Sequence, residues 1–71
     1  MAKVIKAHIT GTVWKIEVKP GDPVSEGTVV AILESMKMEM PVEAEDDGVI
    51  DEILVKEGQP VTEGAPLVSL K

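Results

Sequence analysis

Apolar and polar residues alternate in short runs along the chain, and turn-forming residues separate these runs. In residues 14–18 the apolar side chains of Trp14, Ile16 and Val18 alternate with two charged ones. This period of two indicates a β-strand with one face turned inward. The run ends at residues 19–23, which contain two prolines and a glycine, because proline cannot donate to a strand ladder and glycine tolerates turn geometry.

The same plan occurs twice. After a shift of 37 positions ten residues fall on identical ones, and the matched pairs are Gly11/Gly48, Ile16/Ile53, Val18/Val55, Lys19/Lys56, Gly21/Gly58, Pro23/Pro60, Val24/Val61, Glu26/Glu63, Gly27/Gly64 and Leu33/Leu70. Further strands are expected at residues 29–33, 49–55 and 67–70, with turns at 25–27, 57–60 and 62–64. The paired glycines at these turns serve backbone angles that other residues avoid.

Short strands with turn signals every eight to twelve residues predict an all-β sandwich or barrel. The core is expected to be aliphatic, since Trp14 is the only aromatic residue. A chain of 71 residues makes one small domain, so we assign residues 1–71 to a single domain with repeat halves at about 4–34 and 41–71. Ile16 with Ile53, and Val18 with Val55, should occupy equivalent inward positions.

Composition narrows the classes of partner. The formal net charge is −6, from 13 acidic and 7 basic side chains, which disfavours nucleic acid and anionic membranes and favours a partner with a basic surface. There is no cysteine, and no apolar run approaches the length of a membrane span. We expect a cytoplasmic protein, and we also expect the isolated domain to be a monomer.

Between the two halves lies the stretch Glu-Ser-Met-Lys-Met-Glu-Met, with Lys37 at its centre. We expect a hairpin with Met36-Lys37 at its tip and with Leu33 and Val42 at its outer rungs. Tight hairpins of this kind require positive φ at both central residues and prefer Asn-Gly or Asp-Gly. Met-Lys breaks that preference, and such violations are expected at functional sites. The pseudo-twofold axis of the repeat should place Lys37 at the end opposite both termini.

Met36-Lys37-Met38, preceded by Glu34 and placed between two glycine-punctuated halves, resembles the attachment site of the biotinyl/lipoyl carrier domain family. The resemblance extends over residues 4–70 and is greatest to small single-domain attachment proteins and biotin carboxyl carrier domains. It implies a flattened barrel of two four-stranded antiparallel sheets. It also implies that a biotin protein ligase attaches biotin covalently to Lys37. The domain would then be a carrier, not an enzyme, between biotin carboxylase and carboxyltransferase components.

The residues around the lysine form an expected recognition flank: Glu34, Ser35, Met36, Met38 and Glu39. For Met36 and Met38, packing as flexible core filler is an equal alternative to recognition, whereas packing is favoured for Met40. Lysine side chains are almost wholly protonated at pH 7, and neighbouring carboxylates favour that charged form. The modifying enzyme must therefore take up the proton before the amine can attack an activated acyl group.

Two other functions remain open: a lipoyl carrier with lipoate on Lys37, and an unmodified interaction module. Lipoyl carriers usually have an acid where this chain has Met36, and an interaction module requires no special lysine. No nucleophile–base pair or metal cluster can be assembled from one histidine, His8, and no cysteine. The acidic residues between Glu43 and Asp47 lack the alternating pattern of a calcium loop, and a solvated turn is expected there.

Overall fold

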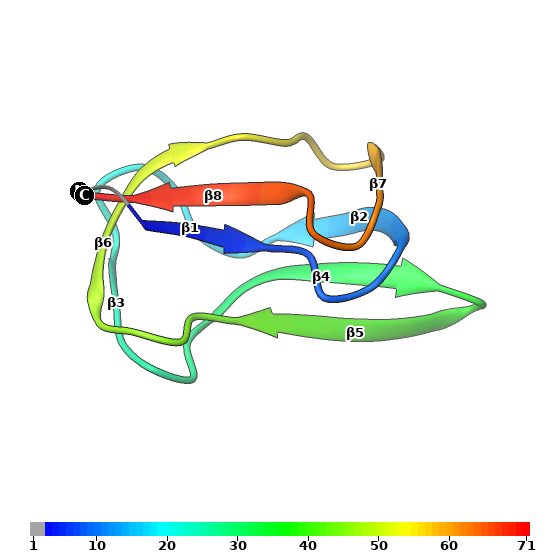
Figure 1. Cartoon of the computed structure of the whole chain (residues 1–71), viewed down its shortest axis with the longest axis horizontal. Coiled ribbons are helices and arrows are strands. Elements are labelled where there is room, and N and C mark those ends of the chain that lie inside the picture. The colour runs from blue at the N-terminus through cyan, green and yellow to red at the C-terminus, as the bar shows by residue number, and fades with distance from the viewer. Residues whose placement is uncertain (1–2) are drawn as a thin grey trace.

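The computed structural model describes residues 3–71, and all the regular structure in this range is β-strand. The eight strands are β1 (Lys3–Lys6), β2 (Gly11–Ile16), β3 (Pro23–Val24), β4 (Val29–Ser35), β5 (Met38–Glu43), β6 (Gly48–Ile53), β7 (Pro60–Val61) and β8 (Pro66–Leu70). They form two four-stranded antiparallel sheets, of strand order β1-β8-β6-β3 and β5-β4-β2-β7 (Figure 1). The all-β architecture of two four-stranded sheets, predicted above, is confirmed.

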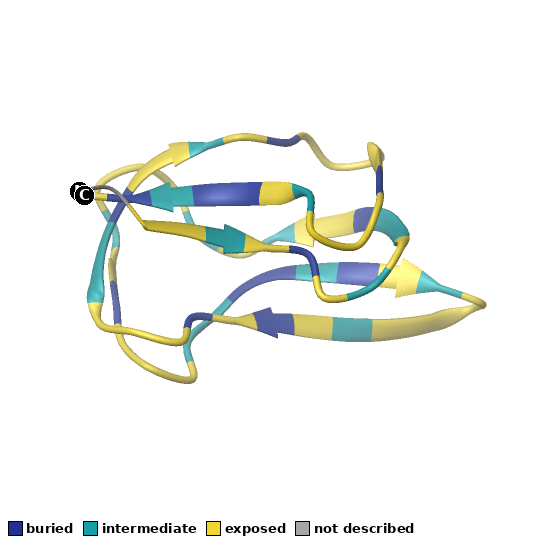
Figure 2. Cartoon of the chain, viewed as in Figure 1, coloured by how far each residue is buried: buried dark blue, intermediate teal, exposed yellow. Residues whose placement is uncertain are grey.

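The core lies between the sheets and draws on both halves of the chain (Figure 2). Its largest fully buried side chains are Val13, Val30, Leu33, Ile50, Leu67 and Val68. Within residues 3–71 no polar or charged residue is buried. The hydrophobic effect therefore holds the fold together with no buried polar network, as the aliphatic composition predicts.

The sequence repeat is also a repeat in space. A shift of 37 residues carries β2 onto β6, β3 onto β7, and most of β4 onto β8. Equivalent hydrogen bonds follow: the N–H of Gly21 donates to the carbonyl of Ile50 at 2.8 Å, and that of Gly58 donates to Val13 at 2.6 Å. Both glycines have positive φ, 93° and 90°. The pseudo-twofold relation therefore extends to individual backbone contacts, and each half can serve as an internal reference for the other.

The prediction that Trp14 faces inward was wrong. The register of β2 against β4 shifts between Val13 and Lys15, and this β-bulge leaves Trp14 47% exposed while Val13 is fully buried. A bulge places two residues opposite one and resets the alternation of faces. The strand also begins earlier than expected and ends at Ile16. Counting in twos along 14–18 misses the bulge because Trp14 and Lys15 both face outward there, so the inward face passes from Val13 directly to Ile16.

The expected symmetry of the other apolar pairs is present in part. Ile16 and Ile53 are both half-buried against the core. Val18 is also half-buried, whereas its counterpart Val55 is buried. All four pack inward, but the centre of the core is occupied by the fully buried side chains named above.

The four edge strands of the sheets contain prolines or lysines. The edge strands are β1, β3, β5 and β7; prolines occur in three of them, Pro23, Pro41 and Pro60, and β1 carries Lys3 and Lys6. The molecule measures 32 × 18 × 17 Å. The β4–β5 hairpin projects at one end of the long axis, and the start of β1 and the end of the chain lie at the other (Figure 1).

Candidate functional site: the lysine hairpin

The projecting hairpin has a two-residue turn, Met36-Lys37, between the paired residues Ser35 and Met38. Met36 and Lys37 have φ of 52° and 66°, and they are the non-glycine residues with positive φ among residues 3–71. Positive φ at both central positions is what a type I′ turn requires. The predicted tip is confirmed, and neither residue is of the kind that this turn prefers.

The expected outer rungs of the hairpin were wrong. Leu33 pairs with Met40, and Val42 pairs with Ala31, so Leu33 and Val42 lie on different rungs. The ladder continues to the pair formed by Val29 and Glu43. Both Leu33 and Val42 are buried, at 0% and 3% exposure. They anchor the base of the hairpin in the core, which holds the unfavourable turn in place.

Gly11, at the start of β2, allows this strand to lie close to the end of β4, the first strand of the hairpin. A Cβ atom added to Gly11 would overlap the carbonyl oxygen of Glu34 and come within 3.3 Å of the Ser35 Cβ. The counterpart Gly48 is less confined, because a Cβ there would meet the Leu70 side chain at 3.3 Å. Gly11 therefore sets the approach of β2 to the last turn-proximal rungs of β4.

The tip presents a lysine between two exposed methionines. Met36 is 92% exposed and Met38 is 63% exposed, so neither serves as core filler. Met40, for which packing was expected, is half-buried and pairs with Leu33. Lys37 is exposed, and the ion pairs found within residues 3–71, Lys3–Asp46 and Lys15–Glu17, do not involve it. The amine is thus presented to solvent on a rigid support.

All the residues expected at the recognition flank are brought together by this hairpin. Ser35 and Met38 form the pair next to the turn, and Glu34 and Glu39 form the following pair. Both glutamates are exposed. Like charges directly opposite each other in a ladder are unfavourable. This pair adds a second departure from local preference beside the positive-φ turn.

Two features of the site were not found from the sequence: the outward Trp14 and the close approach at Gly11. The repeat contained a signal for the first. Position 51, the counterpart of Trp14, carries an aspartate, and a charged residue in an equivalent strand position indicates an outward face. Gly11 gave no comparable signal, since the turn argument applied to Gly21/Gly58 and Gly27/Gly64 and gave Gly11 no role.

The remaining candidates lie away from the tip. His8 is exposed in the bend after β1. Asp46 pairs with Lys3 at 3.1 Å, and the Asp47 Oδ1 accepts a hydrogen bond from the Glu26 N–H at 3.1 Å. Over residues 3–71 no group of three or more His, Asp or Glu side chains is arranged to hold a metal ion. The same residues include no helix long and apolar enough to cross a membrane.

A lysine at the tip of a hairpin, on two sheets related by pseudo-twofold symmetry, defines a class of small β domain. Sequence comparison identifies the family to which this class belongs. A family profile described as "Biotin-requiring enzyme", the biotin/lipoyl family, matches residues 1–70. The chain belongs to this family. The carrier domains of this family are not catalysts themselves, and the chain is a carrier domain of this kind.

Relatives and solved structures agree with this membership. The chain is 48% identical over 44 residues to the "Biotin/lipoyl attachment protein" of Bacillus subtilis, covering 62% of this chain and 60% of that protein. It is equally identical over 44 residues to "Biotinylated protein TB7.3" of Mycobacterium tuberculosis, covering 62% of each. The aligned region therefore spans less than two thirds of these relatives.

Among solved structures, Kluyveromyces lactis urea carboxylase matches with a TM-score of 0.93 and 35% identity, over 100% of this chain and 6% of that one. A single-chain, multi-domain long-chain acyl-CoA carboxylase matches with a TM-score of 0.91 and 30% identity, over 99% of this chain and 7% of that one. In both cases the fold corresponds to a small part of a much larger protein.

Proposed function

We propose that this domain is a biotin carboxyl carrier in which biotin is joined through an amide to the Nζ of Lys37. The observation that carries the proposal is the position of Lys37, exposed in a strained two-residue turn at the end of the molecule opposite the chain's end. Such a turn is retained only when the surrounding ladder holds it. Similarity to a urea carboxylase and an acyl-CoA carboxylase supports the choice of biotin.

The residues present fit a covalently attached group. Lys37 offers a primary amine on a flexible four-carbon stem. Met36 and Met38 leave the amine accessible, and the hairpin beneath it is anchored by buried side chains. When attached, biotin would supply the chemistry of holding a carboxyl group between a biotin carboxylase and a carboxyltransferase. The chain itself supplies the rigid support and the recognition surface.

Attachment requires a biotin protein ligase, because no described side chain is ion-paired or hydrogen-bonded to Lys37. We propose that Glu34, Ser35, Met36, Met38 and Glu39 are read by that ligase. They form the turn and the two rungs below it. The ligase would take the proton from the Lys37 ammonium, and the neutral amine would attack the activated carboxyl of biotin, forming the amide as the activating group leaves.

The test is to offer the unmodified domain to a biotin ligase and to a lipoate ligase and to compare initial rates. We expect biotinylation to be faster by at least about tenfold, and intact mass should show one added group. Lys37→Arg should abolish labelling, while Lys56→Arg, the control, should leave it unchanged. Circular dichroism should show that both variants keep the fold. Labelling that persists in Lys37→Arg, or faster lipoylation, would contradict the proposal.

A further inference from the structure

The exposed hairpin tip is too small to account for recognition by an enzyme. A specific protein interface usually covers about 800 Å² on each partner. The molecule exposes 4571 Å² in all, so such an interface would take roughly a sixth of its surface. The turn offers only Met36, Lys37 and Met38. An enzyme that forms an interface of this size around Lys37 would therefore also contact a face of the sheet that carries the hairpin.

The internal repeat allows the residue in the bulge of β2 to be compared with its counterpart in the other half. Trp14 lies in the bulge of β2, and its counterpart Asp51 lies in the equivalent bulge of β6, where the register shifts between Ile50 and Glu52. Both residues are exposed. The same bulge thus forms with a tryptophan or with an aspartate. The bulge itself therefore does not require an aromatic residue, and Trp14 exposes 47% of its surface.

The two halves also differ at the position beside the bulge on the neighbouring strand, which is apolar on β4 and polar on β8. Ile32, half-buried on β4, pairs with Lys15, and Pro41 lies opposite it on β5. The counterpart of Ile32 in the second half is Ser69. Apolar side chains are therefore placed on the outer face beside Trp14, and a polar residue replaces the isoleucine on the equivalent face of the other sheet.

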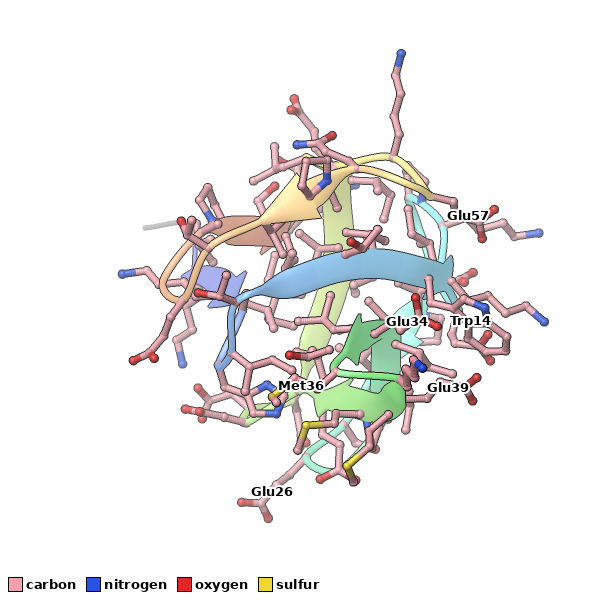
Figure 3. All side chains as sticks on the ribbon, turned by 90° about the vertical axis from the view of Figure 1, so that its right-hand side faces the viewer. Trp14, Glu26, Glu34, Met36, Glu39 and Glu57 are labelled. Carbon is pink, nitrogen blue, oxygen red and sulfur yellow. The ribbon has the colours of Figure 1, made fainter. Side chains whose placement is uncertain are left out.

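Charge indicates what the partner presents. Glu34 and Glu39 are directly opposite each other, and neither takes part in the ion pairs found within residues 3–71. Figure 3 shows Trp14, Glu34 and Glu39 on one side of the hairpin end, with Met36 on the other. A cation from a partner would relieve the repulsion between the two glutamates. An arginine or lysine there would also lie near the ring of Trp14, which attracts cations.

We propose that Trp14, Ile32, Glu34 and Glu39 form a docking face, the tryptophan face, for the enzyme that acylates Lys37. The partner presents an arginine or lysine to the two glutamates and an apolar group to Trp14. Trp14 is a positioning residue, since it orients the enzyme over the hairpin and does not contact the reacting amine. This inference rests on the proposed acylation of Lys37.

The experiment measures kcat and KM of biotin ligase for the unmodified domain. Trp14→Ala should raise the KM about tenfold and leave kcat within about twofold, because docking and not chemistry is weakened. The matched control is Asp51→Ala, in the symmetric bulge, which should leave both constants unchanged. Glu34→Gln combined with Glu39→Gln should raise the KM and reduce its dependence on salt concentration. An unchanged KM in Trp14→Ala, or an equal rise in Asp51→Ala, would overturn the tryptophan face.

A second measurement avoids any effect of substitution on folding. Because Trp14 is the only aromatic residue, wild-type chain labelled with fluorotryptophan gives a single fluorine resonance. Addition of ligase should shift or broaden it, and an unaltered resonance at saturating ligase would contradict docking through this face. The two proposals fail separately. If the ligase biotinylates the wild-type chain but the fluorine resonance does not respond, only the tryptophan face is overturned. If the ligase does not biotinylate the wild-type chain, both proposals are overturned.

Discussion

At the scale of single residues, the site concentrates choices that cost stability. Met36 and Lys37 adopt positive φ, which costs an L-residue with a side chain about 1–2 kcal/mol each relative to its preferred conformations. Glu34 and Glu39 add like charges on facing positions. Elsewhere the positive-φ positions among residues 3–71 are glycines. The exceptions therefore coincide with the place where a lysine side chain must be presented.

A substitution at the turn tests this cost. Met36→Asn should stabilise the unmodified domain, because asparagine tolerates positive φ better than methionine. The gain should be about 0.5–1 kcal/mol, which corresponds to a rise in Tm of several degrees in a domain of this size. Thermal unfolding of the two chains measures it. Met38→Asn, on the strand beside the turn, is the control and should give no such rise; an equal rise would show that the turn is not strained.

At the scale of elements, the hairpin depends on the strand beside it. β2 lies close to the end of β4 at Gly11, where a side chain would overlap the Glu34 carbonyl oxygen. Backbone atoms give way less readily than the end of a side chain. The equivalent contact at Gly48 is with the Leu70 side chain, which can change rotamer. The two halves share one fold but differ in how tightly this contact is made.

This difference gives a prediction for the paired glycines. Gly11→Ala should lower the free energy of unfolding by about 1–3 kcal/mol, in the range of overpacking substitutions, and should slow biotinylation by displacing the hairpin. Gly48→Ala should cost less and leave the labelling rate unchanged. Chemical denaturation and initial labelling rates are the two measurements. Equal effects at the two positions would mean that the close contact at Gly11 is not specific to the hairpin.

Much of this arrangement could be predicted from the sequence, because it depends on local signals. The repeat and the turn glycines follow from spacing and turn chemistry, and the Met36-Lys37 tip follows from its position between the two repeat halves. The bulge at Trp14 could not be predicted by counting in twos, since Trp14, Ile16 and Val18 alternate regularly in the sequence although the inserted residue turns Trp14 outward. The rungs at Leu33 and Val42 depend on strand lengths and bulges. The approach at Gly11 is a contact between distant segments, which no local pattern encodes.

At the scale of the whole molecule, the core and the site are separate. The fully buried side chains come from both halves and lie between the sheets, whereas Lys37 lies at the far end of a body 32 Å long. Ile16 and Ile53 are half-buried, so truncating either should cost less than truncating the fully buried Ile50. The stabilising burial of apolar side chains thus lies away from the hairpin tip.

This separation predicts that modification does not alter stability. Unmodified and biotinylated domains should melt within a few degrees of each other, because a group on an exposed lysine buries little surface. Ile50→Ala should lower the stability of both forms equally, by about 2–5 kcal/mol. Scanning calorimetry of the four samples measures this. A biotinylated form that melts far higher would mean that the attached group packs against the domain, with Met36 and Met38 as its contacts.

The prolines at the edges of the sheets affect how copies of this domain associate at high concentration. Open sheet edges invite a neighbouring molecule to add a strand, which leads to fibres. Here proline interrupts the donor pattern of β3, β5 and β7, and two lysines charge the short edge of β1. Many copies held close together would therefore resist polymerising. Each hairpin would keep its own lysine free, even at the local concentrations found inside large assemblies.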